Sequence, residues 1–392
     1  MLHKRIADID IDDVEKFCLQ CNPEGAWLDY KQSISHTKAN EQIAKLVSAF
    51  ANAHGGWALF GVSEKKDASG RGIPDKLVGI DMARMPGDQI QQVSLNAIYP
   101  PVIPEMQWCP LKTDPTKGIL VVRIFESDST PHRLGEDEVR IRVNDISAIA
   151  NEGKKASIDE IEMLLNRRQK SVELKQRLLA RAFERAVFKD GSPQLRAYCL
   201  PLYPSRPLAD WNALSLVAKK SRSWSGFRGA NCLIPAHESL IERFTRSDGV
   251  GRRAALEFNV YGLTLLNTII WDSWVGQDMT IKSSTCLTIL DSVVRAADDF
   301  YKSVGFGGLV EFGVSLDVGT AECRFDVGND NGETLQIPDH QFEITQSVLA
   351  HQLSDDQTLA AMVTEFLWAM GDGDVINCDQ VQAIKSYRDQ SH

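Results

Sequence analysis

A glycine pair between a helix and a buried strand is the feature that most limits how this chain can fold. Apolar residues recur on one face of Asn40–Ala53 at three- and four-residue spacing, which predicts an amphipathic helix. His54-Gly55-Gly56 ends that helix, because glycine readily adopts the left-handed conformation of a helix end. The apolar run Trp57–Val62 then predicts a buried strand. A helix and a strand joined this closely must pack on each other, as in a layered domain.

Elements on both sides of this unit predict an α+β (mixed α/β) domain over residues 1–165. Strands are expected at 28–32, 76–80, 119–125 and 138–143, with helices at 11–21 and 87–98. The polar stretch 63–72 is expected to be a loop. The capping box Ser157-Ile158-Asp159-Glu160 opens a long helix that leads out of the domain.

Residues 166–392 predict a second α+β domain, whose role no motif reveals. Sheet is expected at 195–202, 256–270 and 309–316, and helix at 287–303 and 345–370. No run of eighteen apolar residues predicts a membrane span, and the first residues lack an apolar signal region. Eight cysteines scattered over 392 residues suit a reducing compartment. We therefore expect a cytoplasmic protein with no membrane partner.

Charge is unevenly distributed along the chain. The formal net charge is −10, but residues 167–253 carry 18 Lys and Arg against 7 Asp and Glu, while residues 254–392 carry 6 against 21. A basic middle region between acidic flanks favours a surface that faces a polyanion. The alternative is a solvated helix whose basic residues pair with acidic neighbours.

Three carboxylates and a lysine are candidates for one catalytic site. Glu24 and Asp29 lie at the start of the first strand, and Lys31 shares a strand face with Asp29. Glu64 follows the next strand, so the acids converge if the two strands are neighbours. Such a cluster binds Mg²⁺ or Mn²⁺ through oxygen ligands, and Lys31 adds a donor to phosphate. Taken alone, this spacing also arises by chance among 53 acidic residues.

The sequences of two segments resemble motifs of the Schlafen AlbA-like nucleic-acid-binding domain. Glu24-Gly25-Ala26-Trp27-Leu28-Asp29-Tyr30-Lys31 is similar to that family's Glu-x-x-x-x-Glu-Phe-Lys motif. Val47–Glu64 resembles its second signature, a helix ending in Ala-Phe-Ala-Asn-Thr, then Gly-Gly, a strand and Gly-Val-Asp-Asp. Weaker likenesses in the same order extend the resemblance over residues 14–165.

The resemblance implies nucleic-acid binding and, as in some members, metal-dependent cleavage of tRNA or other structured RNA. Carried over by position, the acidic triad falls on Glu24, Asp29 and Glu64. Asp29 is shorter than the usual Glu and Glu64 longer than the usual Asp, so the charges are kept and the geometry shifts by about a methylene. Ser63 replaces the other acid of that turn.

Basic residues outside the triad are candidates for binding nucleic acid. Arg140 and Arg142 alternate with apolar residues on one strand, which suits backbone contacts or a solvated sheet face. Arg167 and Arg168 begin a basic helical run that continues through the middle region. Cys18 and Cys21 form a lone pair of thiols without the four ligands of a zinc site, so zinc is not favoured.

The first hypothesis is therefore a Schlafen-like endoribonuclease with Mg²⁺ or Mn²⁺ as cofactor and RNA, tRNA above all, as partner. Antiphage defence or growth arrest would suit such an activity, by family analogy alone. The second hypothesis is a non-catalytic regulator that binds DNA or RNA through the same domain. A third places function in the acidic part as a protein-interaction module. Homo-oligomerisation is left open.

Overall fold

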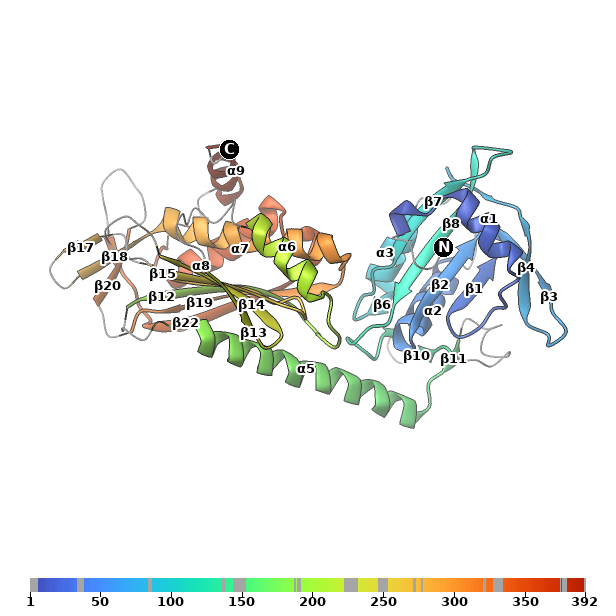
Figure 1. Cartoon of the computed structure of the whole chain (residues 1–392), viewed down its shortest axis with the longest axis horizontal. Helices are drawn as coiled ribbons and strands as arrows, with labels where there is room; N and C mark the ends of the chain where they lie inside the picture. Colours follow the sequence, from blue (N-terminus) through green and yellow to red (C-terminus); the bar gives the residue numbers. More distant parts are fainter. Residues whose placement is uncertain are drawn as a thin grey trace. The chain divides into compact units, whose positions relative to one another are not determined.

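The computed structural model in Figure 1 describes most of the chain. The described ranges are 6–33, 39–83, 87–135, 138–143, 153–186, 188, 192–221, 232–245, 253–270, 273–275, 278–319, 322–326, 334–373, 375 and 379–390. They divide into two compact units, Met1–Ser171 and Val172–His392, and the division falls inside the long helix α5 (Ile158–Ala186). Both units combine helices and sheets, which confirms the predicted α+β class.

The first unit is organised around a five-stranded sheet. Its strands are β1 (Leu28–Lys31), β2 (Gly55–Phe60), β8 (Lys117–Phe125), β5 (Ile80–Asp81) and β7 (Glu105–Pro110). They follow the order β1-β2-β8-β5, and β7 also pairs with β8. The strands β1 and β2 run parallel with Asp29 opposite Ala58. This pairing confirms that the two strands carrying the motifs are neighbours.

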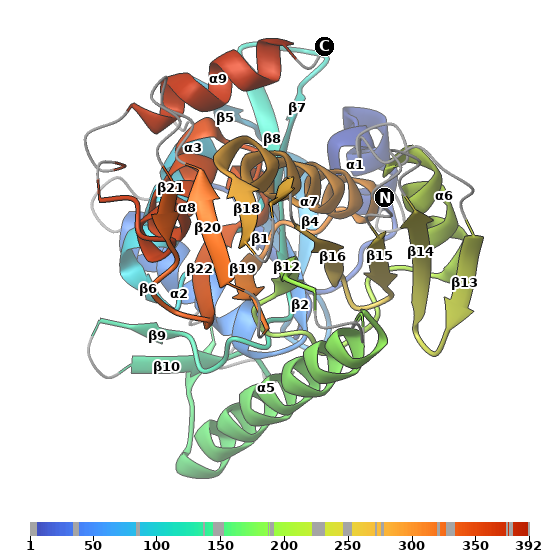
Figure 2. The same cartoon turned by 90° about the vertical axis from the view of Figure 1, so that its left-hand side faces the viewer.

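Helices cover both faces of this sheet (Figure 2). The helices α2 (Ala39–Asn52) and α3 (Gly87–Ala97) pack on one face, where Phe50 is completely buried. The helix α1 (Ile11–Leu19), capped by Asp10, packs Val14 and Phe17 on the other face. Burying one such aromatic or aliphatic side chain contributes roughly 1.5–3 kcal/mol. The apolar residues of β2 alternate between the two faces of the sheet, so their burial stabilises the packing of both helical layers.

The glycine pair at the start of β2 is required by the packing. Gly55 has φ = +70°, and a Cβ there would lie 2.6 Å from the carbonyl oxygen of Ile124. A Cβ on Gly56 would lie 2.3 Å from the Phe50 ring. The helix-to-strand reversal therefore has no room for a larger side chain at either position.

One predicted loop in this unit is wrong, because residues 63–72 belong mostly to a hairpin. The strands β3 (Val62–Lys66) and β4 (Gly72–Leu77) pair antiparallel, with a bulge between Ser63 and Glu64. Gly61, at φ = +98°, turns the chain from β2 into β3. Polar residues on an exposed hairpin lack the apolar alternation that marks a strand, which is why the sequence pattern missed it.

A smaller sheet completes the first unit. It has the order β11-β10-β9-β6 and comprises β6 (Ile98–Tyr99), β9 (Arg133–Leu134), β10 (Glu138–Ile141) and β11 (Lys154–Lys155). The chain after β10 runs beside α2, where the backbone N–H of Arg142 donates to the carbonyl of Ala49 at 3.2 Å. This segment brings Arg142 to the first sheet.

The second unit is built on a seven-stranded antiparallel sheet in the order β13-β14-β15-β16-β12-β19-β22. The strands are β12 (Gln194–Pro201), β13 (Cys232–Ala236), β14 (Ser239–Thr245), β15 (Arg253–Asn259), β16 (Thr264–Ile269), β19 (Leu309–Asp317) and β22 (Gln341–Leu349). The helices α6 (Trp211–Ser221), α7 (Ser283–Val304) and α8 (Asp356–Ala369) cover one face, and the second half of α5 covers the other (Figure 1). The remaining elements are β17 (Ser273–Val275), β18 (Asp278–Lys282), β20 (Glu322–Asp326), β21 (Thr334–Gln336) and α9 (Gln380–Gln390).

The predicted helix at 345–370 is wrong in its first part. Residues up to Leu349 belong to the edge strand β22, which pairs with β19 along nine residues. Only Asp356–Ala369 is helical as α8. Pairing with a buried strand overrode the local helical pattern.

No helix in the described ranges is long and apolar enough to cross a membrane.

Candidate active site

Glu24 is fastened between the first strand and the β3–β4 hairpin. Its backbone N–H donates to the Gly72 carbonyl at 2.8 Å, and its Oε1 accepts from the backbone N–H of Tyr30 at 2.9 Å. Only 4% of Glu24 is exposed. Because β1 is the edge strand of its sheet, the free N–H of Tyr30 is available to a side chain rather than to another strand.

The Glu24 and Glu64 carboxyl groups meet over Gly72. A Cβ on Gly72 would lie 2.3 Å from Oε2 of Glu64 and 2.5 Å from Oε2 of Glu24. Burial, above all, and then the negative charge of Asp29 raise the pKa of Glu24 to about 7, and its hydrogen bond with Glu64 acts in the same direction. Glu24 therefore holds a proton close to neutral pH, as expected of a buried carboxyl group with another acid beside it.

Asp29 is the triad member whose carboxylate oxygens both face cations. Its side chain is completely buried. Oδ1 accepts from Nη2 of Arg142 at 2.7 Å, and Oδ2 lies 2.7 Å from Nζ of Lys31. The triad residues thus come together, but Asp29 is held as an ion pair whereas Glu24 and Glu64 face each other.

Arg142 is buried and lies beneath the first strand instead of at the surface. Its Nε donates to the Gly25 carbonyl at 2.9 Å and its Nη2 to the Leu28 carbonyl at 3.2 Å. The guanidinium carbon lies 4.4 Å from the centre of the Phe50 ring. With no exposed side-chain surface, this arginine is placed to hold β1 and Asp29, not to contact a phosphate backbone.

Glu24 and Glu64 fit a divalent metal ion better than Asp29 does. Two carboxyl groups from different elements, already within contact of each other, are a suitable oxygen donor set for Mg²⁺ or Mn²⁺, which retain several water ligands. Asp29 would join them only if Lys31 moved from Oδ2. Within the described residues, no group of three acidic, histidine or cysteine side chains is already arranged around one point.

One edge of this cluster is open to solvent. The side chains of Lys31 and Glu64 are 26% and 36% exposed, and Trp27, which lies between Glu24 and Asp29 in sequence, is 42% exposed. An approaching ligand would therefore meet the Lys31 ammonium group and the Glu64 carboxylate before the buried acids. An ammonium group suits a phosphate oxygen.

We expect Gly72→Ala to disrupt the carboxyl pair because its Cβ would overlap both side chains. Loss of the Glu24–Glu64 contact should abolish any activity that depends on it and lower the Glu24 pKa in part, because burial and the charge of Asp29 still raise it. Carboxyl titration by NMR would measure the shift. Gly307→Ala, at a glycine with open space around it, is the matched control and should change neither property. An unchanged Glu24 pKa in Gly72→Ala would contradict this interpretation.

The other predicted nucleic-acid-binding arginines make contacts within the first unit. Nε of Arg140 lies 2.6 Å from Oε1 of Glu138, and its Nη1 donates to the Gly153 carbonyl at 2.8 Å. Nη1 of Arg167 lies 3.2 Å from Oε1 of Glu126 and is 3.3 Å from the Ala53 carbonyl. Arg168, next to it on α5, is half-buried. None of the three lies among the acids described above.

Part of the basic middle region is paired with acids. Lys175 lies 2.8 Å from Glu311, Lys220 lies 2.7 Å from Asp299, and Arg185 pairs with Glu257. This is the arrangement of the alternative interpretation, in which acidic neighbours neutralise the basic run. Three further residues of this region, Arg222, Trp224 and Arg228, lie outside the described residues.

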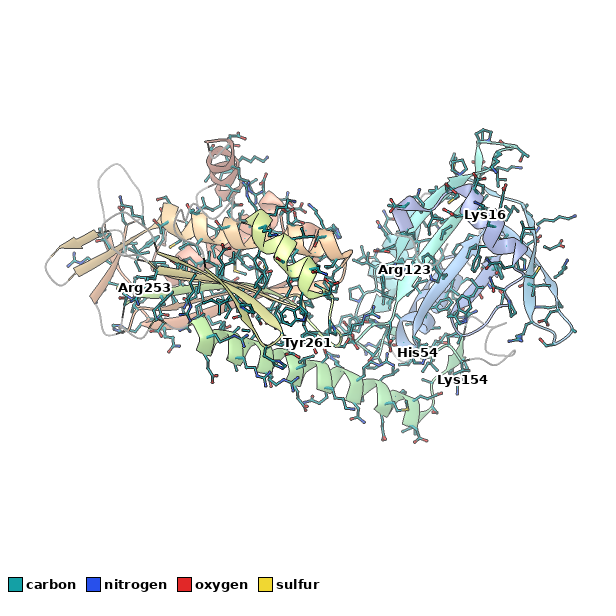
Figure 3. All side chains as sticks on the ribbon, viewed as in Figure 1. Lys16, His54, Arg123, Lys154, Arg253 and Tyr261 are labelled. Carbon is teal, nitrogen blue, oxygen red and sulfur yellow. The ribbon has the colours of Figure 1, made fainter. Side chains whose placement is uncertain are left out.

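Arg123 is a candidate nucleic-acid-binding residue that the sequence-based predictions did not include. Its guanidinium carbon lies 4.3 Å from the centre of the Phe125 ring and 5.2 Å from that of Trp57 (Figure 3). One third of its side chain is exposed, and its nearest carboxylate, on Glu105, is 3.9 Å away. The alternation of Arg123 and Phe125 on a predicted strand was the available signal, since such residues share a face.

His132 has a structural role rather than one in acid–base chemistry. It is completely buried, its Nδ1 lies 2.6 Å from the Pro100 carbonyl, and its backbone N–H donates to Asn52 at 2.7 Å. Burial lowers the pKa of its imidazole to about 4, so the ring is neutral at pH 7. Asn52 also donates to the carbonyls of His132 and Arg140.

We expect the His132 ring to make the protein less stable as pH falls. An unfolded histidine takes up a proton below about pH 6.5, whereas the folded ring does so only near 4, so stability is lost across that interval. The shift corresponds to at most about 3 kcal/mol. Urea unfolding of His132→Gln between pH 7 and 4.5 should show a shallower loss than the wild type. His54→Gln, at an 80% exposed histidine, is the control.

The pair of thiols lies at the end of α1. Cys18 is partly buried, Cys21 is exposed, and both are free. Burial and the neighbouring Cys21 raise the pKa of the Cys18 thiol to about 12. A thiol held so firmly in its protonated form is a poor nucleophile.

Known proteins resemble the first unit. Residues 24–151 match the family model described as Schlafen, AlbA_2, which confirms the predicted domain, a type associated with nucleic-acid interaction. A solution NMR structure of the N-terminal domain of a RecG-related protein from Nitrosomonas europaea shares 22% identity. The similarity covers 36% of this chain and 90% of that domain, with a TM-score of 0.23. No curated protein matches the chain.

Proposed function

Starting from a Schlafen AlbA_2 domain at residues 24–151, we propose that this protein is a metal-dependent endoribonuclease acting on tRNA or other structured RNA. The observation that carries the proposal is the contact of the Glu24 and Glu64 carboxyl groups over Gly72. Two buried or half-buried acids forced together are costly for a fold and useful for binding a cation. The partly exposed side chains of Lys31 and Glu64 give RNA access to them.

The residues divide into those that bind and those that position. Glu24 and Glu64 are the proposed ligands, and Glu24 gives up its proton when the pair takes up a cation. A bound Mg²⁺ or Mn²⁺ supplies Lewis-acid chemistry and an activated water. Lys31 donates to a non-bridging phosphate oxygen. Oδ2 of Asp29, 2.7 Å from Nζ of Lys31, orients the lysine ammonium group. Arg142 acts through Asp29 and is therefore a positioning residue.

The test is cleavage of total tRNA by the purified full chain with Mg²⁺, Mn²⁺ or EDTA. We expect discrete fragments that require the metal and fall at least about 100-fold in Glu64→Gln, since a transition-state group is removed. Glu162→Gln, the same change at an exposed glutamate of α5, should cleave normally. Cleavage that persists in EDTA or in Glu64→Gln would refute the proposed site.

A second candidate is a regulator that binds nucleic acid without cutting it. The ion pairs of Asp29 with Arg142 and Lys31 favour it, because they give one of the acids a purely structural role. Under this alternative, the full chain shifts labelled tRNA or DNA in a gel but produces no fragments with either metal. Lys31→Ala should weaken binding in both cases, whereas Glu64→Gln should abolish only cleavage.

A further inference from the structure

A row of polar side chains crosses the large sheet of the second unit. Asn267 on β16, Arg196 on β12 and Ser315 on β19 lie directly opposite one another in register. Cross-strand partners point to the same face, with Cβ atoms about 4.5–5.5 Å apart. The Arg196 guanidinium lies 5.4 Å from the centre of the Phe183 ring, so this is the face that α5 covers.

Each residue of this row has a buried polar atom that lacks a hydrogen-bond partner among the residues described. The atoms are Oδ1 of Asn267, Nε of Arg196 and Oγ of Ser315. Asn267 is 1% exposed and Ser315 is 9% exposed. One such atom is unremarkable, but three at adjacent positions, comprising a charged donor, a neutral donor and an acceptor, form a polar cluster without an internal partner.

The acids that face this row already have other partners. Glu343, opposite Ser315 on β22, accepts from the Tyr198 hydroxyl at 3.0 Å. Glu311 pairs with Lys175, and Glu257 pairs with Arg185. Arg196 therefore has no carboxylate partner within the part of the chain that the structure describes. Water can satisfy Asn267 and Ser315, but it leaves the half-buried guanidinium without a counter-charge.

The side of the row near the end of α5 is closed by a well-connected set of amides. Asn267 donates through Nδ2 to the Ala186 carbonyl at 2.6 Å and to Gln194 at 3.0 Å. These two bonds are made by the amide nitrogen and leave Oδ1 of Asn267 without a hydrogen-bond partner among the described residues. On the same side, Arg253 lies 5.3 Å from the Phe188 ring centre (Figure 3). The Asn267 amide is therefore held in one orientation.

We propose that this polar cluster binds the oxyanion of a small ligand, a phosphate or a carboxylate. Arg196 Nε and Ser315 Oγ donate to the oxyanion, and Asn267 Oδ1 accepts from an N–H of the same ligand or from the O–H of a bridging water. A guanidinium is the side chain best suited to a planar or tetrahedral oxyanion. The second unit is then a ligand-binding domain, whatever reaction the first unit carries out.

Isothermal titration of the full chain at low ionic strength tests this site. Inorganic phosphate and adenosine monophosphate probe a phosphate source, while acetate and glycine probe a carboxylate source. We expect saturable binding of at least one pair, weakened tenfold or more in Arg196→Gln. Arg181→Gln removes the same charge from an exposed position of α5 and should bind as the wild type does.

Ser315→Ala provides a second variant that leaves the charge of the polar cluster unchanged. It should weaken binding several-fold while unfolding at the wild-type temperature, so a folding defect in Arg196→Gln does not decide the test. Absence of saturable binding by all four compounds would overturn the proposal. Binding that neither Arg196→Gln nor Ser315→Ala weakens would overturn it as well. Neither outcome depends on tRNA cleavage.

Discussion

Replacing Glu24 by glutamine is expected to stabilise the protein at pH 7 and to abolish RNA cleavage. The Glu24 pKa is raised from 4.5 to about 7, so the folded state holds a proton that the unfolded chain has already released. Ionisation therefore favours unfolding as pH rises from 4.5 towards 7, and the full cost applies above that range. It is at most about 3 kcal/mol, and a neutral glutamine should recover about 1–2 kcal/mol of it.

Urea unfolding at pH 4 and pH 8 measures this effect. The variant should exceed the wild type in unfolding free energy at pH 8 and match it at pH 4, because Glu24 is protonated in both states there. Glu162→Gln, at an exposed position, should shift neither value by more than about 0.5 kcal/mol. A Glu24→Gln variant that is less stable than the wild type at pH 8 would show that the ionised Glu24 stabilises the fold. RNA cleavage that persists in this variant would show that Glu24 is not part of the catalytic site.

Arg142→Met should be strongly destabilising to the first unit. It removes three hydrogen bonds, to Gly25, Leu28 and Asp29, and leaves the Asp29 carboxylate fully buried with only Lys31 beside it. Breaking a buried ion pair in this way costs about 3–5 kcal/mol. Methionine fills much of the volume against Phe50, so lost charge pairing rather than a cavity dominates the effect.

A double-mutant cycle distinguishes the ion pair from packing. Arg142→Met combined with Asp29→Asn should be more stable than Arg142→Met alone, because no uncompensated charge remains. Arg167→Met removes the partly exposed pair with Glu126 and should cost less than about 1 kcal/mol. Strict additivity of the two substitutions would mean that Arg142 and Asp29 do not stabilise each other.

The local features of the first unit were predictable because neighbours in sequence specify them. The apolar period of Ala39–Asn52, the Gly55-Gly56 reversal and the alternation in β8 each depend on a few consecutive residues. The sequence motifs around Glu24 and Glu64 also identify the domain without any knowledge of tertiary contacts. The β3–β4 hairpin and the first part of 345–370 were missed because distant strand pairing decided them.

The sequence by itself thus determined the domain type, the order of its main elements and the identity of the acids that converge. Only the tertiary structure decided what each charge does, because its partners come from far along the chain. Arg142 lies 113 residues from Asp29, and the two meet where β10 leads past α2 to the buried side of β1. Glu64 reaches Glu24 because the hairpin places glycine, without a Cβ, between them. Burial then separates these acids into an ion pair and a proton-sharing pair, a distinction that depends on solvent exclusion and has no local signature.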